Sequence, residues 1–380
     1  MARWISFAIF ITVVITVYSL LNYYFIHKHK NILTIKTTPV LILRLLLITL
    51  ILTPIATAIF SRYDQPSIAA ITGFAGYSWL AFLGLFLGVH GLFDISLYIA
   101  ERNGMRPSEG HTRFISTTAI VVCMVILIYG FFEARNIDVR NITIKTEKLI
   151  SGEKVRVMQI SDVHFSPMIG KEMAQSIKKI ADEQKPDILV STGDLLDPGI
   201  KERDEIVSIL QQIKLPLGKI AIMGNHEFYS TEVYSETFIA DAGFTLLRNQ
   251  SVKVGNNLII SGADDPAIKR VKDASVPPIH SYLTPKTQDR YTVLLKHQPR
   301  IEENSERYFD LQLSGHTHGG QIFPFNYFVR LVFPYMYGRY DLRDDAVLYV
   351  NRGAGTWGPP FRFLAQPEVA IIDLVGVPKG

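Results

Sequence analysis

Four long apolar segments in the first third of the chain constrain its fold more than any other feature. They cover residues 4–26, 39–60, about 78–100 and 114–132. Each approaches the ~20 residues that an α-helix needs to cross the ~30 Å hydrocarbon core of a bilayer. The first segment is too long for the apolar part of a secretory signal, and three more follow it, so we expect it to remain as an anchor. We therefore predict a transmembrane region over residues 1–133.

The charge distribution separates this region from the rest of the chain. Residues 1–133 hold nine Lys/Arg and five Asp/Glu, whereas the remainder holds 30 of each. The remainder is neutral and of ordinary globular composition. Together with the charge-poor first region, this distribution excludes intrinsic disorder, a wholly soluble enzyme and a nucleic-acid-coating protein. The single cysteine, Cys123, lies in the fourth apolar segment and excludes both an intramolecular disulfide and a cysteine-rich zinc site.

Basic residues in the short loops predict the orientation in the membrane. Because cytoplasmic loops carry an excess of Lys/Arg, loops 27–38 and 101–113 are predicted to be cytoplasmic and the chain after residue 133 extracytoplasmic. We thus expect a multi-pass protein of the cell membrane. The loop residues that support this are Lys28, Lys30, Lys36, Arg102, Arg106 and Arg113, and the residues that weaken it are Arg135, Arg140, Lys145 and Lys148, directly after the fourth segment.

The third apolar segment contains His90 and Asp94, which lie on one helical face. Such a pair is expected to face the interior of a helix bundle, where it either serves a proton or ligand site or joins helices to one another. We favour the second interpretation.

After a connecting strand or linker over residues 134–149, residues 150–380 are predicted to form an α/β domain. Apolar strands alternate with amphipathic helices, which implies a largely buried sheet with right-handed crossovers. After Gly243 the pattern becomes rich in strands, and residues 269–286 and 323–345 are expected to be loops that could wall a site. The predicted strands are 155–160, 187–192 and 219–223, with 291–296 and 311–313 among the later ones, and the predicted helices are 171–184, 202–213 and 231–242.

Polar segments directly follow five of the predicted strands. The carboxyl ends of strands in an open α/β sheet converge on one crevice, where ligands bind. Any one of these segments alone is a weak signal, but all five together at strand ends predict a site. The segments are Asp162-Val-His164, Gly193-Asp194-Leu-Leu-Asp197, Gly224-Asn225-His226-Glu227, Lys296-His297 and Gly315-His316-Thr-His318.

These segments supply seven candidate metal ligands. Imidazole, carboxylate and carboxamide groups without thiolate suit Zn, Mn or Fe. Because seven exceed the roughly three or four ligands that one catalytic zinc takes from a protein, we predict two divalent transition metal ions, with Asp194 as the natural bridge. Gly193, Gly224 and Gly315 are expected to supply backbone freedom for sharp turns. The ligands are Asp162, His164, Asp194, Asn225, His297, His316 and His318.

These motifs resemble those of the calcineurin-like metallophosphoesterases, and Gly315–Gln321 and Arg352–Pro360 resemble the bacterial YkuE/YaeI-like branch. The resemblance covers about residues 150–375. It implies a four-layer α/β/β/α sandwich with a dinuclear site, in which His226 binds no metal and lies beside the scissile phosphate. By that pattern, one metal takes Asp162, His164, Asp194 and His318, and the other takes Asp194, Asn225, His297 and His316.

The implied reaction is hydrolysis of a phosphodiester or pyrophosphate by a hydroxide that bridges the two metals, with His226 protonating the leaving oxygen. Arg352 and Arg362 are expected either to clamp a further phosphate or to form ion pairs. Asp197 is expected to orient a ligand, Glu227 to do the same or to cap a helix that begins near Ser230, and His280 to lie on the surface.

Several functions remain open at this stage. The leading one is a membrane-anchored phosphohydrolase whose partners are the lipid bilayer and a phosphoester, with a lipid-linked substrate as one option. The aromatic and basic loop 323–343 then either rests on the membrane interface or packs on its own domain. The alternatives are a tethered phosphatase of soluble or cell-wall phosphoesters, and a membrane sensor that uses the domain for binding.

Overall fold

The computed structural model describes residues 2–379 apart from 30–37, 106–107, 231 and 272–275, and it does not describe the side chains of residues 2–11, 39 and 270–271. The chain forms two compact units. The first comprises residues 1–132 and 358–363, and the second comprises residues 133–357 and 364–380.

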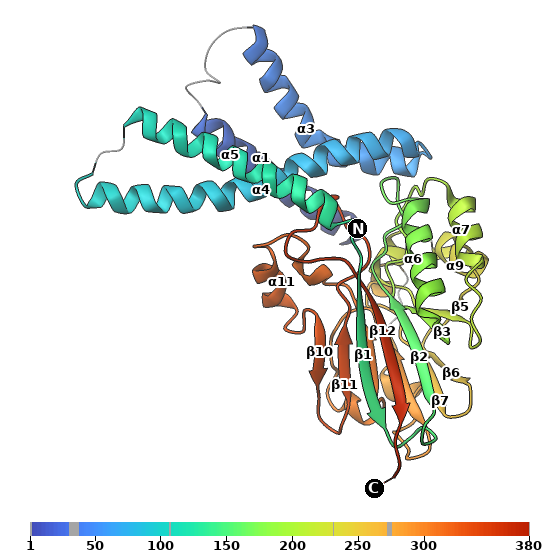
Figure 1. The fold of residues 1–380 in the computed structure, drawn as a ribbon. Helices are drawn as coiled ribbons and strands as arrows, with labels where there is room; N and C mark the ends of the chain where they lie inside the picture. Colours follow the sequence, from blue (N-terminus) through green and yellow to red (C-terminus); the bar gives the residue numbers. More distant parts are fainter. Residues whose placement is uncertain (1, 30–37, 106–107, 231, 272–275, 380) are drawn as a thin grey trace. The chain divides into compact units, whose positions relative to one another are not determined.

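The first unit is helical. It contains α1 (Ala2–Lys28), α3 (Thr38–Arg62), α4 (Pro66–Arg102) and α5 (Glu109–Glu133) (Figure 1). Among the described residues, three helices are long and apolar enough to cross a membrane: Val40–Arg62, Pro66–Arg102 and Glu109–Glu133. This is three rather than the four that we predict from the sequence. The remaining predicted segment, 4–26, is helical as α1, but its side chains up to residue 11 lie outside the described residues.

The helix that contains the third predicted apolar segment is longer than that segment suggests. Helix α4 begins at Pro66, twelve residues before the expected start. Proline is favoured at the first helical position because its fixed φ suits a helix and its missing N–H would have no partner there. The apolar segment in the sequence therefore predicts that a helix is present but does not give the length of that helix.

Polar side chains join α1, α4 and α5 within the first unit. Asp94 accepts hydrogen bonds from the Tyr24 hydroxyl and from Lys28 Nζ, both at 2.7 Å. The neighbouring His90 contacts Asp94 at 3.3 Å, and its Nε2 lies 3.2 Å from Ser116 Oγ. These contacts correspond to the helix-joining interpretation of the His90/Asp94 pair.

Residues 358–363 pack on helices of the first unit although they follow the polar segments in sequence. The Arg362 amide donates to the Gly130 carbonyl at 3.0 Å. The Phe361 ring lies against Phe74 and Phe131, with ring centroids 6.4 and 6.3 Å apart. A side chain at Gly130 would meet the Arg362 carbonyl oxygen 2.7 Å from its Cβ, so glycine permits this close approach.

The second unit contains two six-stranded mixed sheets. In spatial order, the first sheet is β1 (Asp138–Thr146), β12 (Glu368–Gly376), β2 (Lys154–Ile160), β3 (Ile188–Ser191), β4 (Lys219–Ala221) and β5 (Thr245–Leu246). The second sheet is β10 (Gly338–Asp341), β11 (Val347–Val350), β9 (Leu311–Ser314), β8 (Tyr291–Leu295), β7 (Leu258–Gly262) and β6 (Gln250–Val254).

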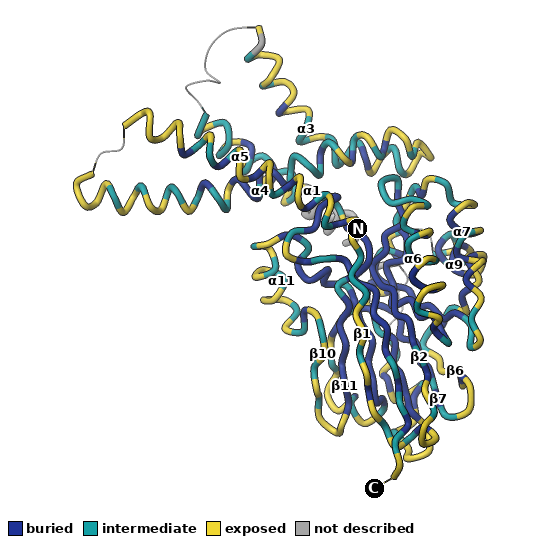
Figure 2. The backbone as a smooth tube through the Cα atoms, viewed as in Figure 1, coloured by how far each residue is buried: buried dark blue, intermediate teal, exposed yellow. Residues whose placement is uncertain are grey.

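Alternation along the strands builds the layers of this unit. On β2, Val157 faces the apolar core shared by the two sheets, whereas Met158 faces the core under the helices. Helices α6 (Lys171–Gln184), α7 (Arg203–Gln211) and α9 (Glu232–Asp241) cover this outer face and expose their far sides (Figure 2). The inner strands of both sheets are largely buried, whereas the edge strands β1, β5, β6 and β10 are partly exposed.

The outer face of the second sheet differs from the expected second layer of helices. Its apolar cluster includes Leu294 on β8, and it is completed by Ile279 in the short η1 helix (Ile279–Ser281) and by Phe309 in a loop after η2 (Ser305–Arg307). Short segments suffice there because only one small cluster needs covering. The two mixed sheets are thus confirmed, and the fourth layer consists of loops and single turns.

Three short α-helices, the single turn η1 and one strand fall where the sequence predicts loops or turns. The range 269–286, of which 272–275 lie outside the described residues, includes the end of α10 (Ile268–Val271). The range 323–345 contains α11 (Asn326–Val332) and β10. Helix α8 (Asn225–Tyr229) begins within the polar segment itself, ahead of the helix predicted over 231–242, which is α9 in the structure.

Candidate metal centre

The polar segments that follow β2, β3, β4, β8 and β9 meet at one end of the two sheets. The His and Asp side chains form three overlapping groups, in each of which the candidate ligand atoms lie within 4.8 Å of one another, and all members but His226 and His316 are buried. The amide oxygen of Asn225 joins them at 3.2 Å from His297 Nε2. All seven candidate ligands therefore belong to one centre. The groups are Asp162/His164/His318, His164/Asp194/His226 and Asp194/His297/His316.

The backbone is strained at most of these residues. Asp162, His164, Asp194, His316 and His318 all have φ between 50 and 75°. This left-handed conformation is uncommon for residues with a Cβ, and strain of this kind persists at functional sites where the surrounding packing holds it in place. Here it turns the chain sharply where each strand ends.

Close approach is a second reason for the glycines in these segments. Gly193 has a positive φ of 94°, as the expected turn requires. At Gly315 the limit is space, because a Cβ there would lie 2.1 Å from Asp162 Oδ2. Asp162 thereby approaches the backbone closely enough to accept the His316 amide at 2.9 Å.

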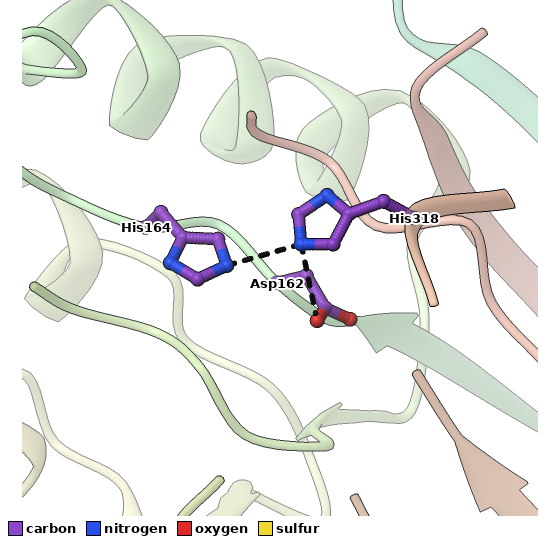
Figure 3. A group of neighbouring side chains, drawn as sticks. All are labelled: Asp162, His164 and His318. Atoms are coloured by element: carbon purple, nitrogen blue, oxygen red, sulfur yellow. Dashed lines mark hydrogen bonds and ion pairs between the residues drawn. The ribbon is translucent and has the colours of Figure 1, made fainter. Parts of the chain in front are cut away.

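His164 and His318 face one another in the first part of the centre. His164 Nδ1 lies 3.2 Å from both oxygens of Asp197, so this nitrogen carries the ring proton and Nε2 is left as an acceptor. His164 Nε2 lies 3.1 Å from His318 Nε2, which is 3.5 Å from Asp162 Oδ1 (Figure 3). Two imidazole nitrogens and a buried carboxylate that converge in this way suit a cation between them.

His297 organises the second part of the centre. Its Nδ1 lies 2.8 Å from the Thr192 carbonyl, which fixes the ring proton on Nδ1. Its Nε2 then points at Asp194 Oδ2 at 3.1 Å, Asn225 Oδ1 at 3.2 Å and His316 Nδ1 at 3.2 Å. Burial opposes a charge on His297, yet Asp194 outweighs it and raises the pKa of the imidazole well above its usual value. The residues present thus favour positive charge at this position and fit a metal ion.

Asp194 lies between the two parts. Its Oδ2 is 3.8 Å from His164 Nε2 and 3.1 Å from His297 Nε2, and its Oδ1 accepts the His226 amide at 2.9 Å. Burial works against ionisation, but the facing imidazoles of His297 and His226 lower the pKa of Asp194 well below its usual value. An ionised carboxylate in this position can contact two cations at once.

His226 lies at the rim of the centre beside His164, with ring centroids 4.7 Å apart. Its Nδ1 is 2.5 Å from Asp197 Oδ1. Burial lowers the proton affinity of this imidazole, but Asp194 and Asp197 together raise its pKa to about 9. His226 therefore carries a proton at neutral pH in this environment.

The remaining sequence-predicted residues take different places. Glu227 is fully buried and accepts backbone amides of Gly224, Asp194 and Leu195 at 2.6 to 3.0 Å, so it caps α8 and fixes the Asp194 loop at the same time. Arg352 is engaged by Glu368 and Asp138 at 2.7 and 3.1 Å, which corresponds to the ion-pair alternative. Arg362 is buried in the first unit, and His280 is exposed.

Two aromatic residues at the centre are not identified by the sequence analysis. The Trp357 ring lies 5.8 Å from the His226 ring and is 54% exposed. Both backbone groups of Trp357 bond to the Gln321 side chain at 3.0 Å. Phe333 lies against His316, with ring centroids 4.8 Å apart. The signals available were the Gly-rich segment around Trp357 and the expected loop 323–345 around Phe333, but each contact joins residues distant in sequence.

Comparisons with known proteins agree with this geometry. The family model of the calcineurin-like phosphoesterases matches residues 155–320. An uncharacterized metallophosphoesterase of Aquifex aeolicus is 38% identical over 65% of this chain and 95% of its own length. YkuE of Bacillus subtilis, also an uncharacterized metallophosphoesterase, is 32% identical over 65% of this chain and 89% of its own.

A further relative is described as a transmembrane protein. The Danio rerio transmembrane protein with metallophosphoesterase domain is 28% identical over 67% of this chain and 62% of its own length. The family match and the buried His/Asp clusters at the strand ends lead to one conclusion: the chain is a metal-dependent phosphoesterase that belongs to the calcineurin-like metallophosphoesterase family.

Proposed function

We propose that the chain is a membrane-anchored phosphohydrolase that cleaves phosphodiester or pyrophosphate bonds with two divalent transition metals, Mn, Fe or Zn. The observation that carries this proposal is the position of Asp194, whose Oδ2 lies 3.8 Å from His164 Nε2 in one part of the centre and 3.1 Å from His297 Nε2 in the other. We assign Asp162, His164, Asp194 and His318 to one metal and Asp194, Asn225, His297 and His316 to the other. When bound, two such ions neutralise phosphate oxygens and lower the pKa of a water that attacks phosphorus in line.

The chain's own residues supply the rest of the reaction. Asp197 holds Nδ1 of His226, so the opposite nitrogen of this ring is available to donate a proton to the leaving oxygen. Glu227 fixes the backbone on either side of Asp194 and Asn225. The partly exposed Trp357 ring beside His226 is placed to contact the leaving group.

The membrane-length helices favour a lipid-borne substrate. Helix α5 ends at Glu133 and β1 begins at Asp138, so a few residues connect the bilayer to the catalytic unit. A phospholipid or lipid-linked pyrophosphate in that bilayer needs only two-dimensional diffusion to meet the centre. Because YkuE is among its relatives, we propose that the chain belongs to the bacterial YkuE-like branch of the family. We also propose that α1 is a fourth membrane span and that residues 150–380 form the catalytic domain.

We also propose that this domain lies outside the cytoplasmic membrane. The basic residues of loops 27–38 and 101–113 support this orientation. Several of them, including Lys30, Lys36 and Arg106, lie outside the described residues, so the proposal rests on the sequence alone.

The function is tested on the full-length protein in phospholipid nanodiscs with added Mn²⁺. We expect hydrolysis of bis-p-nitrophenyl phosphate, and a higher kcat/KM for phosphodiesters or pyrophosphates carried by lipids of the same disc. Equal efficiency on water-soluble and lipid-borne esters would favour a tethered phosphatase of soluble substrates. Metal-loaded protein without turnover of any phosphoester would favour a sensor.

A further inference from the structure

A patch of exposed apolar side chains surrounds α11. Within ten residues the chain exposes Phe323, Phe325, Tyr327, Phe328, Leu331 and Val332, here called the α11 surface, and the exposed fraction reaches 83% at Leu331. Helix α11 itself buries none of its residues. A continuous exposed apolar patch on a folded unit marks a site that binds another protein or a membrane.

Both ends of α11 are held against the candidate metal centre. At the start of the helix, Asn326 Cα lies 2.4 Å from where a Cβ of Gly320 would be, directly after the ligand His318. At its end, Phe333 packs on the ring of the ligand His316. The α11 surface is therefore fixed beside the centre.

The charge of this segment identifies its partner. Residues 319–340 contain Arg330 and Arg339 but no Asp or Glu, and Asp341, directly after them, binds Arg339 at 2.8 and 2.9 Å. Phenylalanine and tyrosine with arginine suit the headgroup region of an anionic bilayer: the rings enter the apolar boundary and the Arg330 guanidinium reaches lipid phosphates. The membrane-length helix α5 ends five residues before β1 begins, so the chain itself holds this unit within reach of a bilayer.

We propose that the α11 surface inserts into the headgroup region of an anionic bilayer and delivers lipid phosphate groups to the metal centre. Membrane contact follows from the surface itself, whereas delivery of the substrate rests on the proposed function. A second copy of the chain is the competing occupant, and the test separates it.

Membrane contact can be measured at a single labelled position in the full chain. Because Cys123 is the only cysteine, a Cys123→Ser background accepts a new cysteine at Leu331, labelled with an environment-sensitive fluorophore. The matched control is Ile150→Cys, which replaces an aliphatic residue that is 58% exposed and lies beside Gly376, where β12 ends. In nanodiscs with phosphatidylglycerol and one protein copy per disc, we expect brominated lipids to quench the Leu331 label several-fold more than the Ile150 label. Equal quenching, or protection at Leu331 only in discs that hold two copies, would overturn the proposal.

Delivery is tested by kinetics on the same discs. Phe328→Ser/Leu331→Ser changes two exposed side chains outside the catalytic groups. It should lower kcat/KM for a lipid-borne phosphodiester at least tenfold and leave bis-p-nitrophenyl phosphate hydrolysis within twofold of the parent. An equal loss on both substrates, or no loss on the lipid, would refute delivery. If the parent protein hydrolyses neither substrate, the proposed function fails, and the quenching experiment still decides membrane contact.

Discussion

Oδ1 of Asp197 lies 2.5 Å from Nδ1 of His226, and the same carboxylate lies 3.2 Å from Nδ1 of His164. One side chain thus fixes the ring proton of two histidines. Burial opposes its ionisation, but the two imidazoles outweigh burial and lower the pKa of Asp197 well below its usual range. The carboxylate leaves Nε2 of His164 available to a metal and Nε2 of His226 available to the leaving group.

Replacing His226 should affect substrates according to their leaving group. Proton donation contributes ~10²–10⁴-fold, and it matters most when the departing alkoxide is a strong base. His226→Ala should therefore retain both metals and lose most turnover of alkyl phosphodiesters. Hydrolysis of p-nitrophenyl esters should fall much less, because p-nitrophenolate departs without a proton.

Two control variants sharpen this measurement. His316→Ala should lose metal and fail on every substrate alike, and the exposed His280→Ala should behave as the parent. Because His226 also lies within ligand distance of His164 and Asp194, metal content must be measured alongside the rates. If His226→Ala loses metal, or if its turnover of alkyl and p-nitrophenyl esters falls by the same factor, then another residue protonates the leaving oxygen.

Asp197→Asn should weaken metal binding and proton transfer together. The amide carries no negative charge and offers one acceptor oxygen in place of two, so it holds both imidazoles more weakly. Loss of such a partner of a metal-ligating histidine typically lowers metal affinity ~10–100-fold. Titration with Mn²⁺ gives the affinity, and the exposed Asp204→Asn is the control. Unchanged affinity and unchanged turnover of alkyl esters would contradict the role of Asp197.

The second unit should bind two transition metals without the membrane helices, because all seven proposed ligands lie within it. We propose a fragment of residues 134–380 with Phe361 and Phe363 changed to serine, since both rings pack against aromatic residues of α4 or α5. Elemental analysis after saturation with Mn²⁺ or Zn²⁺ should give about two ions per chain. A monodisperse fragment with well under two would disprove the dinuclear assignment.

Lys219 should make the stability of this unit depend on pH. Its buried Nζ donates to the Leu210 and Ala242 carbonyls at 2.6 Å, and burial, with Lys214 nearby, lowers its pKa to about 8. Between about pH 8 and the usual lysine pKa of about 10.4, the unfolded chain binds a proton that the folded chain lacks, so the free energy of unfolding rises with pH. Below pH 8 the buried charge costs about 3 kcal/mol.

The comparison with Lys219→Met isolates this effect from other titrating groups. Methionine removes both the charge and the two hydrogen bonds. The informative quantity is therefore the difference in unfolding free energy between parent and variant, and specifically how this difference changes with pH. Chemical denaturation of the 134–380 fragment from pH 7.5 to 10.5 should show the parent gaining stability relative to the variant. A constant difference would mean that Lys219 titrates normally.

The proposed orientation predicts the behaviour of fusions at residue 380. Alkaline phosphatase joined there should be active, because it folds outside the cytoplasm. Green fluorescent protein fused at the same position would be exported by the general secretion route, and this fusion should therefore be dark. The reverse pattern would place the catalytic unit inside the cell without changing the argument for its chemistry.

Local patterns in the sequence were sufficient to identify the candidate metal ligands. Strands show themselves by runs of apolar residues, and Asp162, Asp194 and His297 each follow a strand by two or three positions. Because the carboxyl ends of neighbouring strands converge, the sequence alone predicts that these candidate ligands lie together. The boundaries of α6 were also predicted to the residue, since an amphipathic helix repeats its pattern over several turns.

Contacts between distant segments were decided only by the tertiary structure. The sequence alone left Arg352 open between a phosphate clamp and an ion pair; Glu368 and Asp138, 16 and 214 positions away, engage it in the fold. Helix α11 lacks an amphipathic repeat because it buries no side chain, so its sequence reads as a loop. Residues 358–363 pack on membrane-length helices far earlier in the chain. Periodicity reports which face of a segment is apolar, but the partner of that face, and the proton that each histidine carries, depend on which segments the fold brings into contact.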